Sequence, residues 1–254
     1  MEALVTTFLL VFMRIFGFFV IAPVFGRREF PFQARVGLAL FVTAIIFPVM
    51  DKMAYPNSVL ETIAFFLKEA AVGFTMGFVV FAIFSAVFIM GEIVDFQMGF
   101  GIVSVLDPQT STQVPILGNF FYLFVILIFF TIDGHHVLLD ALIKSFELLP
   151  PGEPVITGNL LFCILDSFYA MFEAGVKMSF PLISATFLAD FALGIMARTV
   201  PQMNVFIIGL PFKIVTGVFF LIILLPAFVA TLDLLFNGSY EMLELVLQGM
   251  AGRP

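Results

Sequence analysis

Long runs of apolar residues, separated by short polar clusters, dominate the chain. Three uncharged runs, 70–91, 114–132 and 214–232, reach or nearly reach the length of about 20 residues that a helix needs to cross a bilayer. Four further runs are interrupted by a charge or a proline, namely 3–25, 36–50, 178–189 and 205–219. Apolar residues do not alternate with polar ones at period two, so the pattern predicts helices rather than strands.

Clusters of Gly, Pro, Asn and Asp separate the apolar runs and predict turns. The most proline-rich cluster, 150–154, divides the chain into a larger part, 1–150, and a smaller part, 151–254. The first run is expected to be a helix of the mature protein, because Glu2 stands where a secretory signal has positive charge and Arg14 interrupts the run. The clusters predict turns at 26–31, 51–58, 107–115, 133–136, 149–158, 198–204 and 237–238.

The composition of the chain indicates that these helices belong to a membrane protein. Hydrophobic residues make up 62% of the chain and charged residues 11%, whereas a soluble domain is about 25% charged. A globule of this size has too little interior to hide so much apolar surface, so lipid or protein partners must cover the rest. We therefore predict an all-α integral membrane protein of helical hairpins. A net charge of −7 without any basic run excludes nucleic-acid binding.

Charged residues inside apolar context are the most informative departures from this pattern. An ionised side chain at the bilayer centre costs at least about 2.5 kcal/mol, so such residues normally face a partner or water. Two interpretations stay open: these charges lie at helix ends in the membrane interface, or they pair across subunit interfaces or line an aqueous path. Candidates for intersubunit polar contacts are Glu92, Asp95, Arg198 and Lys213; the other embedded charges are Arg14, Lys68, Glu69 and Asp190.

Two glycines four residues apart, Gly73 and Gly77, lie on one face of a long apolar run. Small residues at this spacing allow helix backbones to approach closely in lipid. We expect this face to pack tightly against another helix.

Little in the sequence indicates catalysis or metal binding. The two histidines of the chain, His135 and His136, are adjacent, and neighbouring side chains on a helix diverge by about 100°. We expect Asp133 to cap a helix start there, and we expect no metal site. Nucleophile-elbow, zinc-protease and phosphate-binding motifs do not occur, so neither enzyme activity nor a cofactor is expected.

The segment that follows Met98 is unusually apolar for a loop, since loops that contact solvent are generally polar. It is either an ordinary connection between helices or a flexible segment in a pore that blocks ions and yields to a polypeptide. Non-helical backbone at membrane depth is tolerated where protein surrounds it or where it lines a cavity. Its residues are Gly99, Phe100, Gly101, Ile102, Val103, Ser104, Val105, Leu106, Asp107, Pro108 and Gln109.

Several ordered pieces of the chain resemble the FliR family of bacterial flagellar export gates. One set comprises Gly91-Glu92 through Asp107-Pro108-Gln109, then Asp133-Gly134-His135-His136, then the segment 145–152. A second set comprises 189–194, Arg198-Thr199-Val200-Pro201-Gln202-Met203-Asn204-Val205-Phe206 and Gly209-Leu210-Pro211-Phe212-Lys213. The similar pieces run in order from about residue 10 to about residue 226.

This resemblance implies a non-enzymatic subunit of the type III export gate in the bacterial inner membrane, within the flagellar basal body. It implies a FliP-like helical portion, 1–150, followed by a FliQ-like hairpin and C-terminal segment, 151–254. The implied partners are FliP, FliQ and FlhB, with membrane lipid and unfolded flagellar export substrates.

The segment 99–115 would be the plug of the export channel in this family. Ile102, Val103, Val105 and Leu106 would form a dewetting barrier, and Gly99 and Gly101 would let the segment bend aside. Asp107 and Gln109 would anchor it.

Two other assignments stay open: the relative of this gate in virulence-type secretion systems, and a secondary transporter with broken helices around a midplane site.

Overall fold

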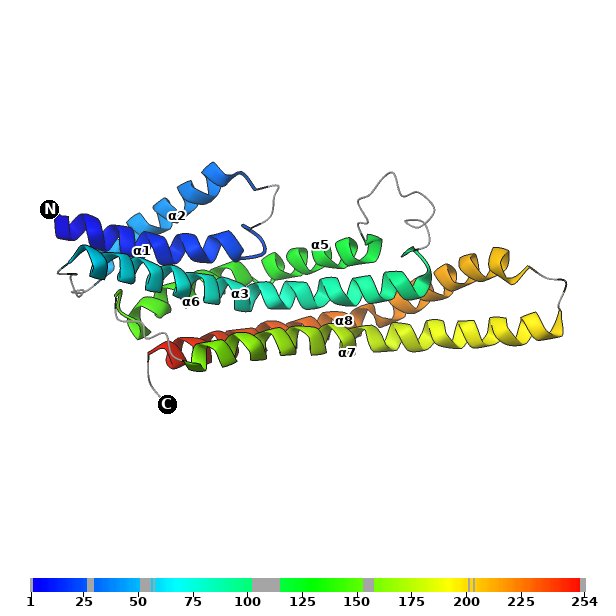
Figure 1. The fold of residues 1–254 in the computed structure, drawn as a ribbon. Coiled ribbons are helices and arrows are strands. Elements are labelled where there is room, and N and C mark those ends of the chain that lie inside the picture. Colours follow the sequence, from blue (N-terminus) through cyan, green and yellow to red (C-terminus); the bar gives the residue numbers. More distant parts are fainter. Residues whose placement is uncertain are drawn as a thin grey trace. The chain divides into compact units, whose positions relative to one another are not determined.

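The computed structural model describes residues 2–26, 30–50, 56, 58–101, 115–152, 158–200, 202 and 204–251. These residues contain no β-strand, and the predicted all-α fold is confirmed. The helices, drawn in Figure 1, are α1 (Glu2–Ile21), α2 (Phe32–Ile46), the short 3₁₀ helix η1 (Phe47–Val49), α3 (Val59–Met98), α5 (Ile116–Thr131), α6 (Gly134–Leu148), α7 (Gly158–Thr199) and α8 (Val205–Met250).

Four of the described helices, α1, α3, α7 and α8, are long and apolar enough to cross a membrane. A fifth span results if α5 and α6, which meet at a bend of 72°, are counted as one broken span. The predicted helical integral membrane protein is thus confirmed. The helices α3, α7 and α8 contain 40, 42 and 46 residues, about twice the 20 or so that a bilayer crossing requires.

The helices α7 and α8 continue through positions where the sequence predicted interruptions. Pro181 lies inside α7, and α8 contains Lys213 and the predicted turn at 237–238. The turn prediction is wrong because Phe236, Leu243 and Leu247 are buried, and the burial of one such side chain contributes about 1.5–3 kcal/mol. That gain exceeds the cost of about 1 kcal/mol for a glycine in a helix.

The chain divides into two compact units. Unit 1 comprises 1–83, 128–169 and 236–254, and unit 2 comprises 84–127 and 170–235. Both units contain segments from either side of the proline-rich cluster at 150–154. Each also contains an antiparallel stretch of α7 with α8, marked by a hydrogen bond from Ser167 to Met242 in unit 1 and an ion pair of Asp190 with Lys213 in unit 2 (Figure 1).

In unit 1 the helices α1 and α3 meet backbone to backbone. A Cβ atom on Gly73 would collide with the carbonyl oxygen of Arg14, and one on Gly77 would lie 2.9 Å from the carbonyl oxygen of Phe18. From the other side, a Cβ on Gly17 would lie 3.1 Å from the carbonyl oxygen of Ala70. Gly73 and Gly77 therefore face a close helix neighbour, as small residues at this spacing allow.

A fully buried ion pair joins three helices of unit 1. Arg14 of α1 donates from Nε to Oε2 of Glu69 in α3 at 2.6 Å, and both side chains are 0% exposed. The Nη1 and Nη2 atoms of Arg14 donate to the carbonyl oxygens of Ser145 and Leu149, both at 2.9 Å. Because these carbonyls lie at the C-terminal end of α6, which is the negative end of its dipole, the cation also complements the helix dipole.

The other half of the pair is satisfied as well. Glu69 accepts a hydrogen bond on Oε1 from the backbone N–H of Gly152 at 2.9 Å, and the guanidinium of Arg14 lies 4.2 Å from the ring centre of Phe146. Both charges therefore have partners within this chain. The sequence had suggested instead that such charges lie at helix ends in the membrane interface, pair across subunit interfaces or line an aqueous path.

The corner between α5 and α6 differs from its prediction in two ways. Asp133 occupies the N-cap position of α6 with φ 57° and ψ 26°, and its side chain makes no capping hydrogen bond. A left-handed backbone differs from the extended backbone with which an N-cap residue normally directs its side chain to the first turn. The rings of His135 and His136 do not diverge, since their centres lie 4.0 Å apart.

We expect Arg14→Met to lower the free energy of unfolding of the chain by about 3–5 kcal/mol, because it leaves the Glu69 carboxylate buried without its cation. The double variant R14M/E69M should lose less than R14M alone. Chemical denaturation in detergent measures both. The exposed pair Asp140–Lys144 of α6 is the matched control, and D140N should change little. Equal losses for R14M and D140N would contradict the structural role of Arg14.

Candidate functional site

The segment between α3 and α5 carries the sequence motif that most resembles a functional element. Residues 102–114 lie outside the described residues, and they include Ile102, Val103, Ser104, Val105, Leu106, Asp107, Pro108 and Gln109. The residues on either side of this segment are described, and all of them belong to unit 2. Residues 91–101 and 115–118 form the base of this segment.

Asp95 connects the two ends of the segment. Both of its carboxylate oxygens accept the backbone N–H of Leu117 at 3.0 Å, and Oδ2 also accepts the N–H of Gly118 at 3.3 Å. These N–H groups belong to the first turn of α5, where no helical carbonyl is available to them. The carboxylate thus caps α5 from the last turns of α3 and complements the positive end of its dipole.

The same residue takes part in ending α3. The backbone carbonyl of Asp95 accepts the N–H of Phe100 at 3.0 Å, and the carbonyl of Phe96 accepts the N–H of Gly99 at 3.2 Å. Gly99 has φ +90°, so this pair of bonds forms a Schellman-type helix end with glycine at the left-handed position. Gly99 therefore stops α3, and Asp95 contributes to both helix ends at once.

A glycine pair brings the backbones of α3 and α5 into contact at this base. A Cβ atom on Gly91 would collide with the Cα atom of Gly118, and one on Gly118 would lie 3.1 Å from the ring of Pro115. The two glycines are separated by 26 residues of sequence, so no local spacing pointed to this pair. The pair can be recognised only in the structure, where α5 runs back along α3.

A second polar group lies in unit 2 among α3, α7 and α8. The Nζ atom of Lys213 lies 2.6 Å from Oδ1 of Asp190, and Nε2 of Gln97 donates to Oδ2 of Asp190 at 3.4 Å. Close by in sequence, a Cβ on Gly217 of α8 would meet the side chain of Met98. The end of α3 is therefore attached to the α7–α8 hairpin by one polar and one apolar contact.

The four residues that the sequence singled out for intersubunit contacts have different environments. Asp95 and Lys213 have partners within this chain, as described above. Glu92 and Arg198 are exposed on α3 and α7. Contacts of any of the four with another subunit stay a prediction.

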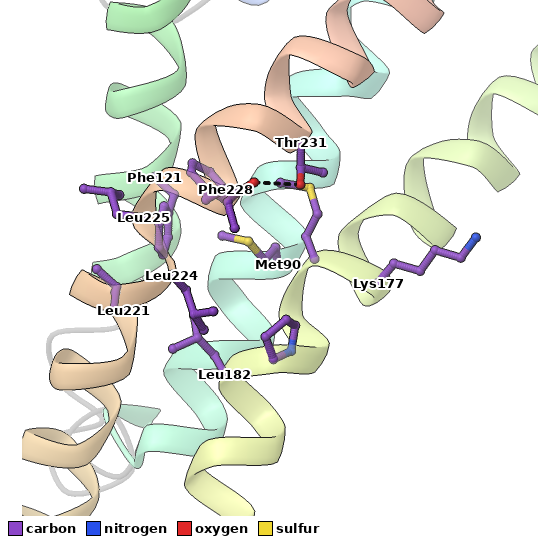
Figure 2. Close-up of a pocket in the computed structure, with 12 residues that line it drawn as sticks. Met90, Phe121, Lys177, Leu182, Leu221, Leu224, Leu225, Phe228 and Thr231 are labelled. Atoms are coloured by element: carbon purple, nitrogen blue, oxygen red, sulfur yellow. Dashed lines mark hydrogen bonds between the residues drawn. The ribbon is translucent and has the colours of Figure 1, made fainter.

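Unit 2 also contains an apolar cavity of about 300 Å³ beside the proline of α7. Its lining includes Met90, Phe121, Leu182 and Phe228 (Figure 2). Lys177 extends away from the labelled apolar side chains and pairs with Glu173 at 2.6 Å, and the hydroxyl of Thr231 donates to a backbone carbonyl at 2.9 Å. The cavity therefore presents apolar surface and no arrangement of groups suited to proton transfer or nucleophilic attack.

We expect Asp95→Ala to lower the free energy of unfolding by about 1–2 kcal/mol, as loss of a helix N-cap does, because the Leu117 and Gly118 amides lose their acceptor. Hydrogen exchange of these two amides should become faster. Glu92→Ala, which removes an exposed carboxylate three residues earlier on α3, is the matched control and should leave both amides unchanged. Similar exchange rates in the two variants would show that Asp95 does not hold the loop base.

Comparison with known proteins places the chain among export proteins. Residues 5–239 match the sequence profile of a family described as "Bacterial export proteins, family 1". The chain is 38% identical to the flagellar biosynthetic protein FliR of Bacillus subtilis over 243 residues, which cover 94% of each chain. It is 30% identical to FliR of Aquifex aeolicus over 248 residues, covering 97% of this chain and 96% of the relative. The secretion system apparatus protein SsaT of Salmonella typhimurium is 26% identical over 196 residues, or 76% of each chain.

Proposed function

This chain belongs to family 1 of the bacterial export proteins, and from that membership we propose that it is a subunit of the flagellar type III protein export gate. It contributes one helical unit and a plug loop to a pore that conducts unfolded polypeptides. It assembles with FliP, FliQ and FlhB in the inner membrane at the flagellar basal body. It carries no catalytic role. Export energy comes from other components.

The apolar surface that the chain leaves uncovered is the observation that carries this proposal. Within an apolar stretch of 18 residues in each helix, 61% is buried inside the chain for α3, 28% for α7 and 11% for α8. Large side chains such as Phe187, Phe191, Val215 and Ile222 are more than half exposed. Lipid covers about 20 residues of each helix, yet α7 and α8 are each about twice that long, so neighbouring protein subunits must cover the remainder.

The geometry at the base of the 102–114 segment supports the plug assignment. A plug must be attached firmly at both ends while its middle moves, and here Asp95 caps α5 and also helps to end α3. The Gly91–Gly118 contact brings the two attachment points to backbone distance. The segment between them is rich in β-branched and apolar residues, which favour exclusion of water and ions from a narrow pore.

The polar groups also favour an assembled subunit over a self-contained transporter. A transporter site at the membrane midplane needs polar groups directed into a cavity. In unit 2 the Asp190–Lys213 pair and the Asp95 carboxylate bind other groups of the chain, and the cavity is apolar. Exposed Glu92 and Arg198 remain for contacts with neighbouring subunits. The identity and coverage are higher for the FliR proteins of Bacillus subtilis and Aquifex aeolicus than for SsaT, which favours the flagellar system.

Copurification tests the assembly directly. With FliP and FliQ coexpressed, the tagged chain should bring both down from detergent extracts. F187E/F191E, which places two charges on an exposed apolar face of α7, should reduce their recovery, because buried unpaired carboxylates disfavour the interface. The matched control F187L/F191L keeps the face apolar and should retain both partners. A monodisperse chain that supports export without FliP and FliQ would contradict the proposal.

Ion leakage tests the plug. Replacing Ile102, Val103, Val105 and Leu106 together by serine should raise the membrane conductance for small ions, because a hydrophobic constriction loses its barrier when its lining becomes polar. V59S/L60S is the control, since both residues are exposed at the start of α3, away from the loop in sequence. Unchanged conductance together with intact motility would exclude a sealing role.

A further inference from the structure

The corner between α5 and α6 brings together three side chains that commonly bind transition metals. Asp133, His135 and His136 each offer one ligand atom, and these three atoms lie within 4.8 Å of one another. Oδ1 of Asp133 lies 3.5 Å from Nδ1 of His136, and the two imidazole rings are inclined by 40°. All three residues belong to unit 1.

Local backbone geometry explains why adjacent histidines can converge. Asp133 adopts a left-handed conformation immediately before the first turn of α6, and its side chain makes no capping hydrogen bond to the backbone of that helix. The ring of His135 packs on Phe130, the penultimate residue of α5, with ring centres 5.2 Å apart. The ring of His136 faces Asp133. The divergence expected for neighbours within a regular helix therefore does not apply at this helix start.

The hydrogen bonds of these groups leave ligand atoms available. Nδ1 of His135 is buried and has no hydrogen-bond partner among the described residues, although buried polar atoms are almost always paired. Asp133 makes no capping bond through its side chain. Asp133 and His136 are exposed at the corner, so an ion could reach them from solvent.

We propose that Asp133, His135 and His136 bind a divalent transition-metal ion, with zinc as the best fit, and that the ion joins Asp133, at the 72° bend after α5, to the first turn of α6. Imidazole and carboxylate together suit zinc, whereas calcium and magnesium require mostly oxygen ligands. Ligand atoms at about 2.0–2.1 Å from a tetrahedral zinc ion lie about 3.3–3.4 Å apart, so small side-chain rotations close the site. Water takes the fourth position. This inference does not depend on the export function.

Cobalt binding provides the test, because Co²⁺ in a tetrahedral site absorbs strongly in the visible range and zinc displaces it. The full chain is purified in detergent with a tag that contains neither histidine nor cysteine, and bound metal is removed with a chelator. We expect one Co²⁺ per chain, with an absorption that zinc abolishes. His136→Gln should lower the affinity at least about tenfold, since even the loss of an outer partner of a metal ligand costs about 10–100-fold.

Two controls make the result specific to this corner. Asp140→Asn removes an exposed carboxylate of α6 that pairs with Lys144 at 2.8 Å, and it should leave cobalt binding unchanged. Cys163→Ser removes the thiol of the chain and should also leave binding unchanged. Zinc should raise the thermal unfolding temperature of the wild-type chain and not that of H136Q, because an ion that binds the folded state stabilises it.

Two outcomes would overturn the proposal. One is a wild-type chain that shows no cobalt absorption at concentrations that saturate ordinary zinc sites. The other is equal binding by the wild-type chain and H136Q. Because His136 is exposed, H136Q should fold normally, and a monodisperse elution profile verifies this before the titration.

Discussion

The buried pair of Arg14 and Glu69 is the constraint on which unit 1 depends. Taking two charges out of water is costly, and their attraction offsets this cost only when every remaining donor and acceptor has a partner. Here the partners are carbonyls at the end of α6 and the N–H of Gly152, so the pair is satisfied only when α1, α3 and α6 hold one arrangement. The glycine contact between α1 and α3 fits that arrangement, because Gly73 lies against the backbone of Arg14 itself.

Unit 2 also contains a buried charged group whose partners lie on another helix, but here it joins two helix ends. Asp95 is a buried carboxylate whose charge is taken up by the first turn of α5 rather than by a cation. A helix N-terminus offers free N–H groups and a positive dipole end, so one acidic side chain can attach a helix start to the end of another helix. The consequence is that the two ends of the sequence segment 102–114 are held together, and this base connects the fold of unit 2 to the proposed plug.

The exposed apolar faces of α7 and α8 relate the fold to assembly. The buried charges among the described residues have partners within the chain, whereas the chain itself leaves much of its apolar surface uncovered. Paired buried charges together with a large uncovered apolar surface are expected for one subunit of a larger membrane complex. The corner at Asp133, with two exposed side chains, is a separate feature that brings together three groups of the kind that bind transition metals.

The sequence by itself determined the class of structure. Continuous apolar runs and sparse charge predict membrane helices. The ordered motifs around Asp107, Gly134 and Arg198 indicate the family. Both inferences are possible because they use only residues that are close together in the sequence. Only the tertiary structure decided which charges meet. Arg14 and Glu69 are 55 residues apart, and Gly91 and Gly118 come together only when α5 returns along α3. Local spacing also placed His135 and His136 on diverging faces and a turn at 237–238, and both predictions were wrong. At the histidines, the left-handed backbone of Asp133 overrides the local preference. At 237–238, the burial of apolar residues of α8 does so. Both depend on contacts that no short stretch of sequence contains.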